Sequence, residues 1–152
     1  MKNLIVVYSY HHGNTKKLAE VIAKEINAQI IELPQSDGLS ADYEIIGFGA
    51  GIDSGHHYKE LLEYAEELPQ TDGKIKAFIF STAGIYKEKK TYKDHTQLRD
   101  ILIKKGFEII GEFACSGFDT NSVLKLFGGI NKEHPNDNDL DNAKTFAKSL
   151  IK

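Results

Sequence analysis

The residues with the most evident chemistry lie near the start of the chain, where a short apolar run, Leu4–Val7, ends in a polar turn. A helical pattern of apolar residues begins directly after the turn. The first N–H groups of a helix have no partners within the helix and attract anions. The turn adds hydroxyls, imidazoles and an amide, a density of donors that suits a terminal phosphate. The candidate phosphate-binding residues are Ser9, Tyr10, His11, His12, Gly13, Asn14 and Thr15.

An ordinary strand-to-helix turn is the alternative interpretation of this segment, with Asn14 or Thr15 serving only to cap the helix. Caps alone would not account for so many donors within one turn. Gly13 also lets the backbone approach a ligand closely, because glycine has no Cβ atom. We therefore favour a phosphate site over a plain turn.

Two later segments are rich in small residues. Residues 47–52 resemble a dinucleotide-binding glycine pattern, but Ile52 replaces its last glycine and no helix is expected to begin there. We expect either a pliable loop or a tight turn packed on the first helix. Residues 81–86 end in Tyr86, so a flat ligand could reach the backbone and stack on the tyrosine ring. The alternative is an exposed tyrosine that covers the sheet edge.

Other groups of residues suggest chemistry that their spacing does not support. The pairs His11–His12 and His56–His57 lack a carboxylate or thiolate spaced to complete a metal site, and the second pair is expected to begin a helix. Residues 137–141 start like a calcium loop but lack its glycine and its distal glutamate, so we expect them at a helix N-terminus. Cys115 has no basic neighbours in sequence, which favours a core or rim thiol over a nucleophile.

Composition and charge narrow the class of protein. The 152 residues, 41% of them apolar, suffice for a single domain over residues 1–152 with its own core. The net charge of −3 does not predict binding to nucleic acid or to an anionic membrane. The single cysteine excludes an internal disulfide and favours a reduced, cytoplasmic setting. The first apolar run is too short for a signal peptide or a membrane span.

The elements that must position these residues follow from apolar patterning. Five apolar runs, most without polar alternation, predict strands covered on both faces, as in a parallel sheet. Helical stripes between them, beginning near Leu18, Leu61, Leu98 and Ala143, predict an α/β sandwich of helix, sheet and helix. Ligands of such sheets bind beyond the carboxyl ends of the strands. The runs are Leu4–Val7, Ile30–Leu33, Ile45–Phe48, Ala77–Phe80 and Ile109–Phe113.

Taken together, these residues resemble the flavodoxin family. That family's first loop has two aliphatic residues, an aromatic, a hydroxyl-rich turn, then glycine, any residue and threonine, with alanine four residues later. The matching residues are Val6, Val7, Tyr8, Gly13, Thr15 and Ala19. The order of elements resembles the shorter branch of the family.

The resemblance implies a flavodoxin-like three-layer sandwich with a five-stranded parallel sheet of order 2-1-3-4-5 and FMN at its carboxyl edge. It implies that Gly13, Asn14 and Thr15, with His12, hold the FMN phosphate. The residues implied to border the flavin ring are Ala50, Gly51, Ile52, Thr82, Ala83, Gly84, Ile85 and Tyr86. Because the chain has no tryptophan, Ile52, His56 or His57 would cover the ring face that a tryptophan often covers.

The resemblance further implies a monomeric carrier that passes single electrons between redox partner proteins. One alternative is an FMN-dependent oxidoreductase that uses NAD(P)H to reduce quinones or other small acceptors, although no nicotinamide site is recognisable. Another is a cofactor-free interaction module. A phosphoacceptor signalling domain would need acidic residues after the first and third strands, where this chain has Ser9-Tyr10 and Gly49-Ala50.

Overall fold

The five apolar runs form the strands of one parallel sheet. The computed structural model describes residues 2–10, 13–34, 42–84, 88–117 and 134–152. The strands are β1 (Asn3–Tyr8), β2 (Ala28–Glu32), β3 (Ile45–Asp53), β5 (Lys76–Ala83) and β6 (Glu108–Ser116), in the spatial order β2-β1-β3-β5-β6. Counting these five strands along the chain gives the predicted order, 2-1-3-4-5.

A sixth, two-residue strand was not predicted. β4 (His56–His57) pairs antiparallel with the end of β3, so that Ile52 lies opposite His57. The second histidine pair therefore belongs to a hairpin, and not to the start of a helix as we expected. Helix α2 (Lys59–Glu66) begins only after Tyr58.

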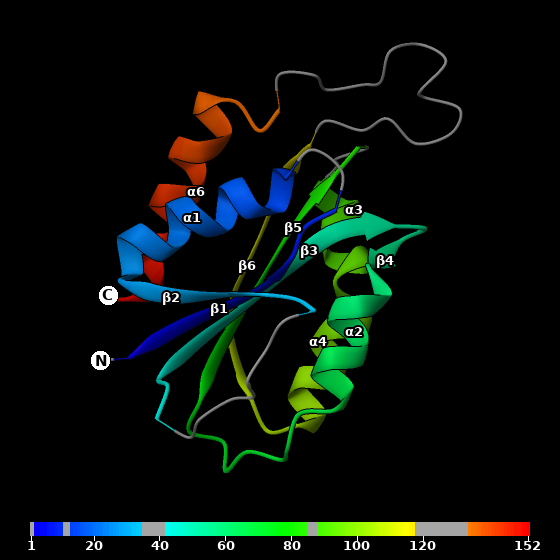
Figure 1. Cartoon of the computed structure of the whole chain (residues 1–152), viewed down its shortest axis with the longest axis vertical. Coiled ribbons are helices and arrows are strands. Elements are labelled where there is room, and N and C mark those ends of the chain that lie inside the picture. The colour runs from blue at the N-terminus through cyan, green and yellow to red at the C-terminus, as the bar shows by residue number, and fades with distance from the viewer. Residues whose placement is uncertain (1, 11–12, 35–41, 85–87, 118–133) are drawn as a thin grey trace.

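Helices cover both faces of the sheet, as Figure 1 shows. One face carries α1 (Asn14–Ile26) and α6 (Asp137–Leu150), whose apolar side chains pack on Ile5, Val7, Phe78 and Phe80. The opposite face carries α2 and α4 (Thr96–Lys104), with the short α3 (Glu88–Asp94) before α4. None of the helices within the described residues is long and apolar enough to cross a membrane.

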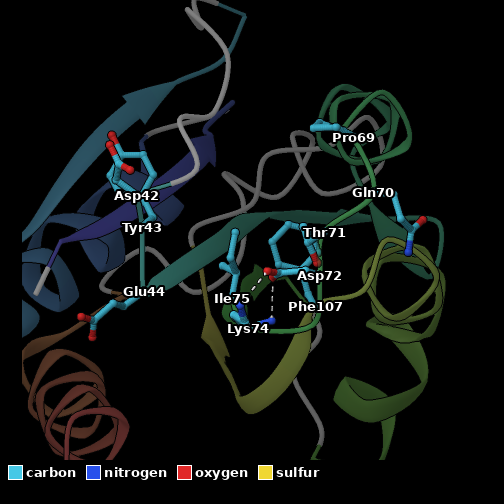
Figure 2. A pocket seen from close by; sticks show the side chains of 10 residues that line it. All are labelled: Asp42, Tyr43, Glu44, Pro69, Gln70, Thr71, Asp72, Lys74, Ile75 and Phe107. Atoms are coloured by element: carbon cyan, nitrogen blue, oxygen red, sulfur yellow. Dashed lines mark hydrogen bonds and ion pairs between the residues drawn. The ribbon is translucent and has the colours of Figure 1, made fainter.

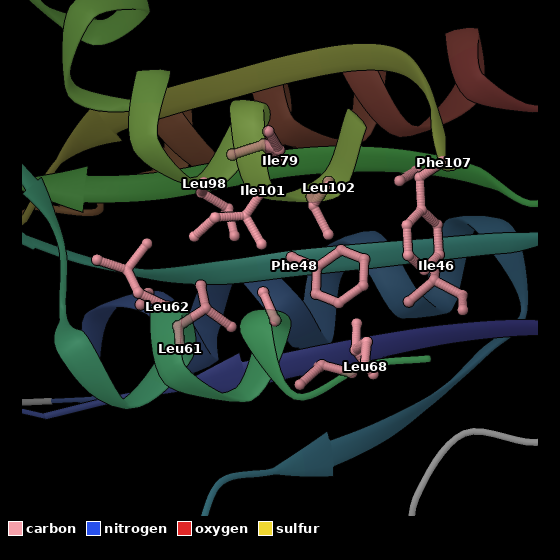
Figure 3. Close-up of a cluster of buried hydrophobic side chains, with 14 of the residues drawn as sticks. Ile46, Phe48, Leu61, Leu62, Leu68, Ile79, Leu98, Ile101, Leu102 and Phe107 are labelled. Atoms are coloured by element: carbon pink, nitrogen blue, oxygen red, sulfur yellow. The ribbon is translucent and has the colours of Figure 1, made fainter. Parts of the chain in front are cut away.

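The core on the α2 and α4 side is built from buried side chains of the sheet and of these two helices. Figure 3 shows Phe48 between Leu61 of α2 and Leu102 of α4. Phe48 also meets Phe107 edge-on, with ring centroids 5.7 Å apart. These side chains are at most 5% exposed, so the helices and the middle strand form one packed unit.

The start of α6 follows the sequence expectation. Asn136 is the N-cap, and its side chain accepts the Asp139 backbone N–H while the Asp139 carboxylate accepts the Asn136 N–H, both at 2.9 Å. Asp137 and Asp139 lie in the first turn, where carboxylates complement the helix dipole. The acidic run is thus a helix N-terminus.

Candidate functional site

The carboxyl ends of four strands lie at one level, and this fixes the position of the candidate site. In the parallel register Tyr8 lies beside Ala50, Ala50 beside Ser81, and Ser81 beside Ala114. The segments that follow these residues therefore emerge at the same edge of the sheet, near the point where the chain order of the strands reverses.

The first turn ends at Gly13, whose backbone is in the left-handed conformation. Gly13 has φ +65° and is the N-cap of α1, with no side-chain hydrogen bond to the helix. Our expectation that Asn14 or Thr15 caps the helix is therefore wrong, because both already lie within it. Ser9 supplies an acceptor instead: its hydroxyl oxygen takes the Lys16 N–H at 3.3 Å. A Cβ built on Gly13 would meet no atom of the described residues within 4 Å, so the described part of the turn is open beside it.

Buried contacts join this turn to two other loops. The hydroxyls of Thr15 and Thr82 are hydrogen-bonded at 2.9 Å. Gly117 follows β6 and donates its N–H to the Ala83 carbonyl at 3.0 Å. A Cβ on Gly117 would lie 2.8 Å from the Asn14 amide nitrogen and 3.1 Å from Thr82 Cβ, so only glycine fits here without displacement. The segments after β1, β5 and β6 thus meet at one place.

The glycine-rich segment is a strand and not the loop or turn that we expected. β3 continues through Ala50, Gly51 and Ile52 to Asp53 and turns back into β4. The Gly51 carbonyl accepts the Tyr58 N–H at 3.1 Å, and a Cβ on Gly51 would lie 2.8 Å from the Tyr58 ring. Gly51 therefore makes room for an aromatic ring that returns from the hairpin.

Three tyrosines gather beside this glycine. The Tyr58 ring meets Tyr8 and Tyr10 edge-on, with centroids 5.8 and 6.0 Å away. Tyr10 is 57% exposed, so the cluster reaches the surface at the rim of the site. Burial raises the pKa of Tyr8, and Glu60 and Tyr10 add to this effect, so the Tyr8 phenol stays protonated near neutral pH. Tyr58 was not among the predicted site residues, because its place depends on the unpredicted hairpin.

The predicted site residues divide into a buried layer and an outer layer. Asn14, Thr15, Ala50, Thr82 and Ala83 are buried, and Ser9, Tyr10, Gly13, Gly51, Ile52 and Gly84 are partly or largely exposed. His11, His12, Ile85 and Tyr86 lie outside the described residues. The described candidates all lie at the same edge of the sheet, and the buried layer supports the outer one.

His57 does not fit the role of covering a flat ligand. Its side chain is fully buried, and its Nε2 lies 3.2 Å from the Phe80 carbonyl oxygen. Its ring packs on that of His95, with centroids 4.8 Å apart. Burial, reinforced by the neighbouring His95, lowers the pKa of His57 to about 3. The ring is therefore neutral and donates Nε2–H to Phe80. Of the three residues expected to cover the ring face, only Ile52 and His56 are partly exposed.

Comparison with known proteins identifies the fold family. A family model described as a flavodoxin domain matches residues 5–148. The chain belongs to the flavodoxin family. Over 153 residues it is 48% identical to an uncharacterized protein of Methanocaldococcus jannaschii, covering 100% of this chain and 99% of that protein.

Solved structures agree with this membership at the level of the fold. A short-chain flavodoxin associated with a bacterial microcompartment superposes with a TM-score of 0.70 at 17% identity, covering 99% of this chain and 97% of that one. A Fusobacterium nucleatum flavodoxin bound to flavin mononucleotide gives a TM-score of 0.66 at 12% identity, covering 99% and 98%.

A cavity of about 530 Å³ lies at the other end of this flavodoxin fold. Figure 2 shows Tyr43, Thr71, Ile75 and Phe107 around it, near the amino ends of the strands. The Asp72 carboxylate there accepts the Lys74 backbone N–H at 3.2 Å and pairs with the Lys74 ammonium at 3.3 Å. This cavity is separate from the predicted site residues.

The single thiol of the flavodoxin domain is a structural group. Cys115 is 4% exposed, and its Sγ donates to the Ser116 carbonyl at 3.4 Å. Burial, with a smaller effect of Asp139, raises the pKa of the thiol to about 12. The prediction of a core or rim thiol is confirmed, because a protonated, buried thiol is a poor nucleophile.

Proposed function

We propose that this chain binds FMN at the carboxyl edge of its sheet and carries single electrons between redox proteins. The observation that supports this most directly is the open turn at Gly13, which precedes the N-terminus of α1 among buried hydroxyls. A similar fold binds flavin mononucleotide in the Fusobacterium nucleatum protein. We further propose that the carrier acts as a monomer in the cytoplasm, where its one buried thiol stays reduced.

The residues at the turn fit a phosphate. Among the described residues that form it, no cation is available to the anion: the nearby Lys16 ammonium pairs with Glu32 at 2.8 Å. The described part of the turn therefore offers neutral donors and the helix dipole to the anion, as is usual at a helix N-terminus. Of the two bonded hydroxyls of Thr15 and Thr82, one donates and the other keeps a hydrogen to donate.

The residues on the other side of the edge fit a flat ring. Gly51 and Gly84 present backbone without a side chain, Ile52 adds a partly exposed aliphatic side chain, and Tyr10 adds an exposed aromatic ring at the rim. Flavin supplies the redox chemistry when it is bound. The chain orients the ring against the ends of β3 and β5 and keeps water from its inner edge, because the layer beneath is buried and packed.

The proposal is tested by reconstitution. Purified protein is titrated with FMN and with riboflavin, which lacks the phosphate, and binding is followed by flavin fluorescence. We expect FMN to bind more tightly than riboflavin and to give the two visible absorption bands of a bound flavin. The same sample with NADH or NADPH and a quinone tests the oxidoreductase alternative, which sustained nucleotide oxidation would favour.

A substitution locates the phosphate. Thr15→Val keeps the shape of a buried side chain but removes its hydroxyl, and we expect about 10-fold weaker FMN binding or more, since a hydrogen bond to a charged group contributes about 1.5–3 kcal/mol. Riboflavin binding should change little. Thr145→Val is the matched control, because Thr145 is an exposed threonine of α6 that bonds only within its helix. Equal affinity for FMN and riboflavin in the wild type would overturn the proposal.

A further inference from the structure

A chain of hydrogen-bonded polar groups lies beneath the candidate site, between the sheet and α4. The Ser81 hydroxyl is 2.7 Å from His95 Nε2, and His95 Nδ1 is 2.9 Å from the Glu112 carboxylate. Arg99 completes the chain with two hydrogen bonds to Glu112, both of 2.8 Å. Ser81 is 1% exposed and His95 fully buried, so the middle of this hydrogen-bonded network is shielded from solvent.

The direction of these bonds follows from the charge of Glu112. Burial raises its pKa, but the hydrogen bonds from His95 and Arg99 outweigh burial and lower the pKa to about 2. The carboxylate is therefore ionised and accepts Nδ1–H of His95. In a neutral His95 the other nitrogen, Nε2, is then an acceptor, and the Ser81 hydroxyl donates a hydrogen bond to it.

The order serine, histidine, glutamate is that of a hydrolytic triad, but hydrolysis is excluded here by access. The Ser81 oxygen lies within a central strand and is 1% exposed, so no acyl substrate can reach it. Within this hydrogen-bonded network, the atom that is free to bind a further proton is Nε2 of His95.

The other ionisable groups described around His95 already form hydrogen bonds, ion pairs or ring contacts. His57 of β4 packs on its ring and stays neutral, and the half-buried His56 bonds to the His57 carbonyl. Lys90 and Asp94 of α3 form an ion pair with each other. Arg99 of α4 neutralises Glu112 of β6. A proton added to His95 would thus be stabilised mainly by Glu112.

This network is joined directly to the candidate flavin-binding segments. Ser81 precedes Thr82 and pairs with Ala50, while His57 lies opposite Ile52 in the hairpin. A negative charge gained at that edge would act on His95 through a buried, weakly screening environment. The Glu112 side chain is 21% exposed and gives the network its contact with solvent.

We propose, resting on the function proposed above, that His95 takes up one proton when the flavin bound at this edge is reduced. The electrons come from a redox protein, or from dithionite in a test, and remain on the flavin. The proton comes from water and forms an N–H bond at His95 Nε2. The Ser81 hydroxyl then accepts this N–H and turns its own hydrogen away. His95 thereby offsets the negative charge of the reduced site.

The test follows the histidine itself. Protein with ¹³C-labelled histidine is loaded with FMN, and the His95 ring signals are titrated with pH by NMR in the oxidised form and after full reduction with dithionite. We expect the pKa of His95 to be higher in the reduced form by about half a pH unit or more, as a nearby negative charge requires. Equal values in the two forms would overturn the proposal.

A potential measurement provides the second readout. In the wild type, the potential for full, two-electron reduction should fall with rising pH between the two His95 pKa values, by up to about 30 mV per pH unit for one proton and two electrons, in addition to any slope of the flavin itself. His95→Gln should lose this segment but keep any pH dependence that belongs to the flavin. His134→Gln is the control and should behave as wild type, because His134 is partly buried, lies outside the predicted site residues and bonds to Asp139.

The outcomes separate this inference from the proposed function. Protein that binds FMN but whose His95 pKa does not move with reduction contradicts the inference alone. Protein that cannot be reconstituted with FMN contradicts both. If His95→Gln does not fold, the NMR titration of the wild type still decides the question.

Discussion

The neutral imidazole of His57 links the stability of the protein to pH. Its pKa is lowered from 6.5 to about 3, by burial first and by His95 second. The unfolded chain therefore binds a proton at His57 below about pH 6.5 that the folded protein does not bind. The resulting stabilisation is complete above pH 6.5 and is lost as the pH falls toward 3. Within that window the free energy of unfolding should drop by up to about 1.4 kcal/mol per pH unit.

We expect His57→Gln to flatten this part of the stability profile, because glutamine does not titrate. Between pH 7 and pH 5 the wild type should lose about 2 kcal/mol more than the variant. Urea unfolding followed by circular dichroism at several pH values measures the difference. His56→Gln should keep the wild-type slope, and an unchanged slope in His57→Gln would show that the folded protein accepts the proton after all.

Single residues were the hardest part of the site to predict. The sequence correctly indicated that Gly13, Asn14 and Thr15 lie at the start of a helix, because an apolar run and a helical stripe flank them. It did not indicate that Ser9 accepts a helix N–H in place of a cap, or that His57 is buried. Both depend on how the backbone turns, which side-chain types alone do not specify.

At the scale of elements, the glycines of β3 are required by the phenylalanines of β5. A Cβ on Gly47 would overlap the Phe78 ring, and one on Gly49 the Phe80 ring. Both rings are fully buried under α1 and α6, and they stack with centroids 5.9 Å apart. Glycines of β3 therefore leave the space that the phenylalanine rings of β5 occupy.

We expect Gly49→Ala to lower the free energy of unfolding by about 1–3 kcal/mol, because overpacking forces rings or backbone to shift. Phe80→Leu should also destabilise, by leaving a cavity. In the double variant the smaller leucine makes room for the alanine, so its loss should be less than the sum by at least about 0.5 kcal/mol. Urea unfolding of the four proteins measures this, and strictly additive losses would contradict the steric explanation.

The elements were predicted where apolar periodicity is strong and missed where it is absent. The five parallel strands and helices α1, α2, α4 and α6 all carry clear apolar runs or stripes. Helix α3 has the sequence EKKTYKD, which has no apolar stripe, so apolar periodicity does not indicate this helix. β4 has two residues, too few for any pattern, and its pairing with β3 follows from tertiary contacts.

At the scale of the whole molecule, the chain topology brings together side chains that are far apart in the sequence. Ser81 and His95 are 14 residues apart and His95 and Glu112 are 17 apart, yet the three side chains form one hydrogen-bonded chain. The strand order implied by the family resemblance correctly brought the loops to one edge. It could not show which side chains meet below that edge, because strand order does not determine which buried polar groups pair.

The two ends of the sheet should respond independently. β5 runs from Lys76, near the cavity around Phe107, to Ala83 at the candidate site, a length of about 23 Å at the rise of a parallel strand. Changes separated by more than about 7–10 Å, with no shared partners, usually have additive effects on stability. A ligand at one end and a substitution at the other should therefore not influence one another.

This independence gives a prediction for the loaded protein. FMN that binds only the folded chain should raise the free energy of unfolding by about 2.7 kcal/mol at a free concentration 100 times its Kd. Phe107→Leu should lower the stability of the unloaded protein, since Phe107 packs on Phe48 in the core, yet leave this FMN-dependent increment unchanged within about 0.5 kcal/mol. Thr15→Val should shrink the FMN-dependent increment at a fixed FMN concentration, because it weakens binding at the site itself. Urea unfolding with and without FMN measures each increment, and one that falls in Phe107→Leu as much as in Thr15→Val would mean that the two ends of the fold are coupled.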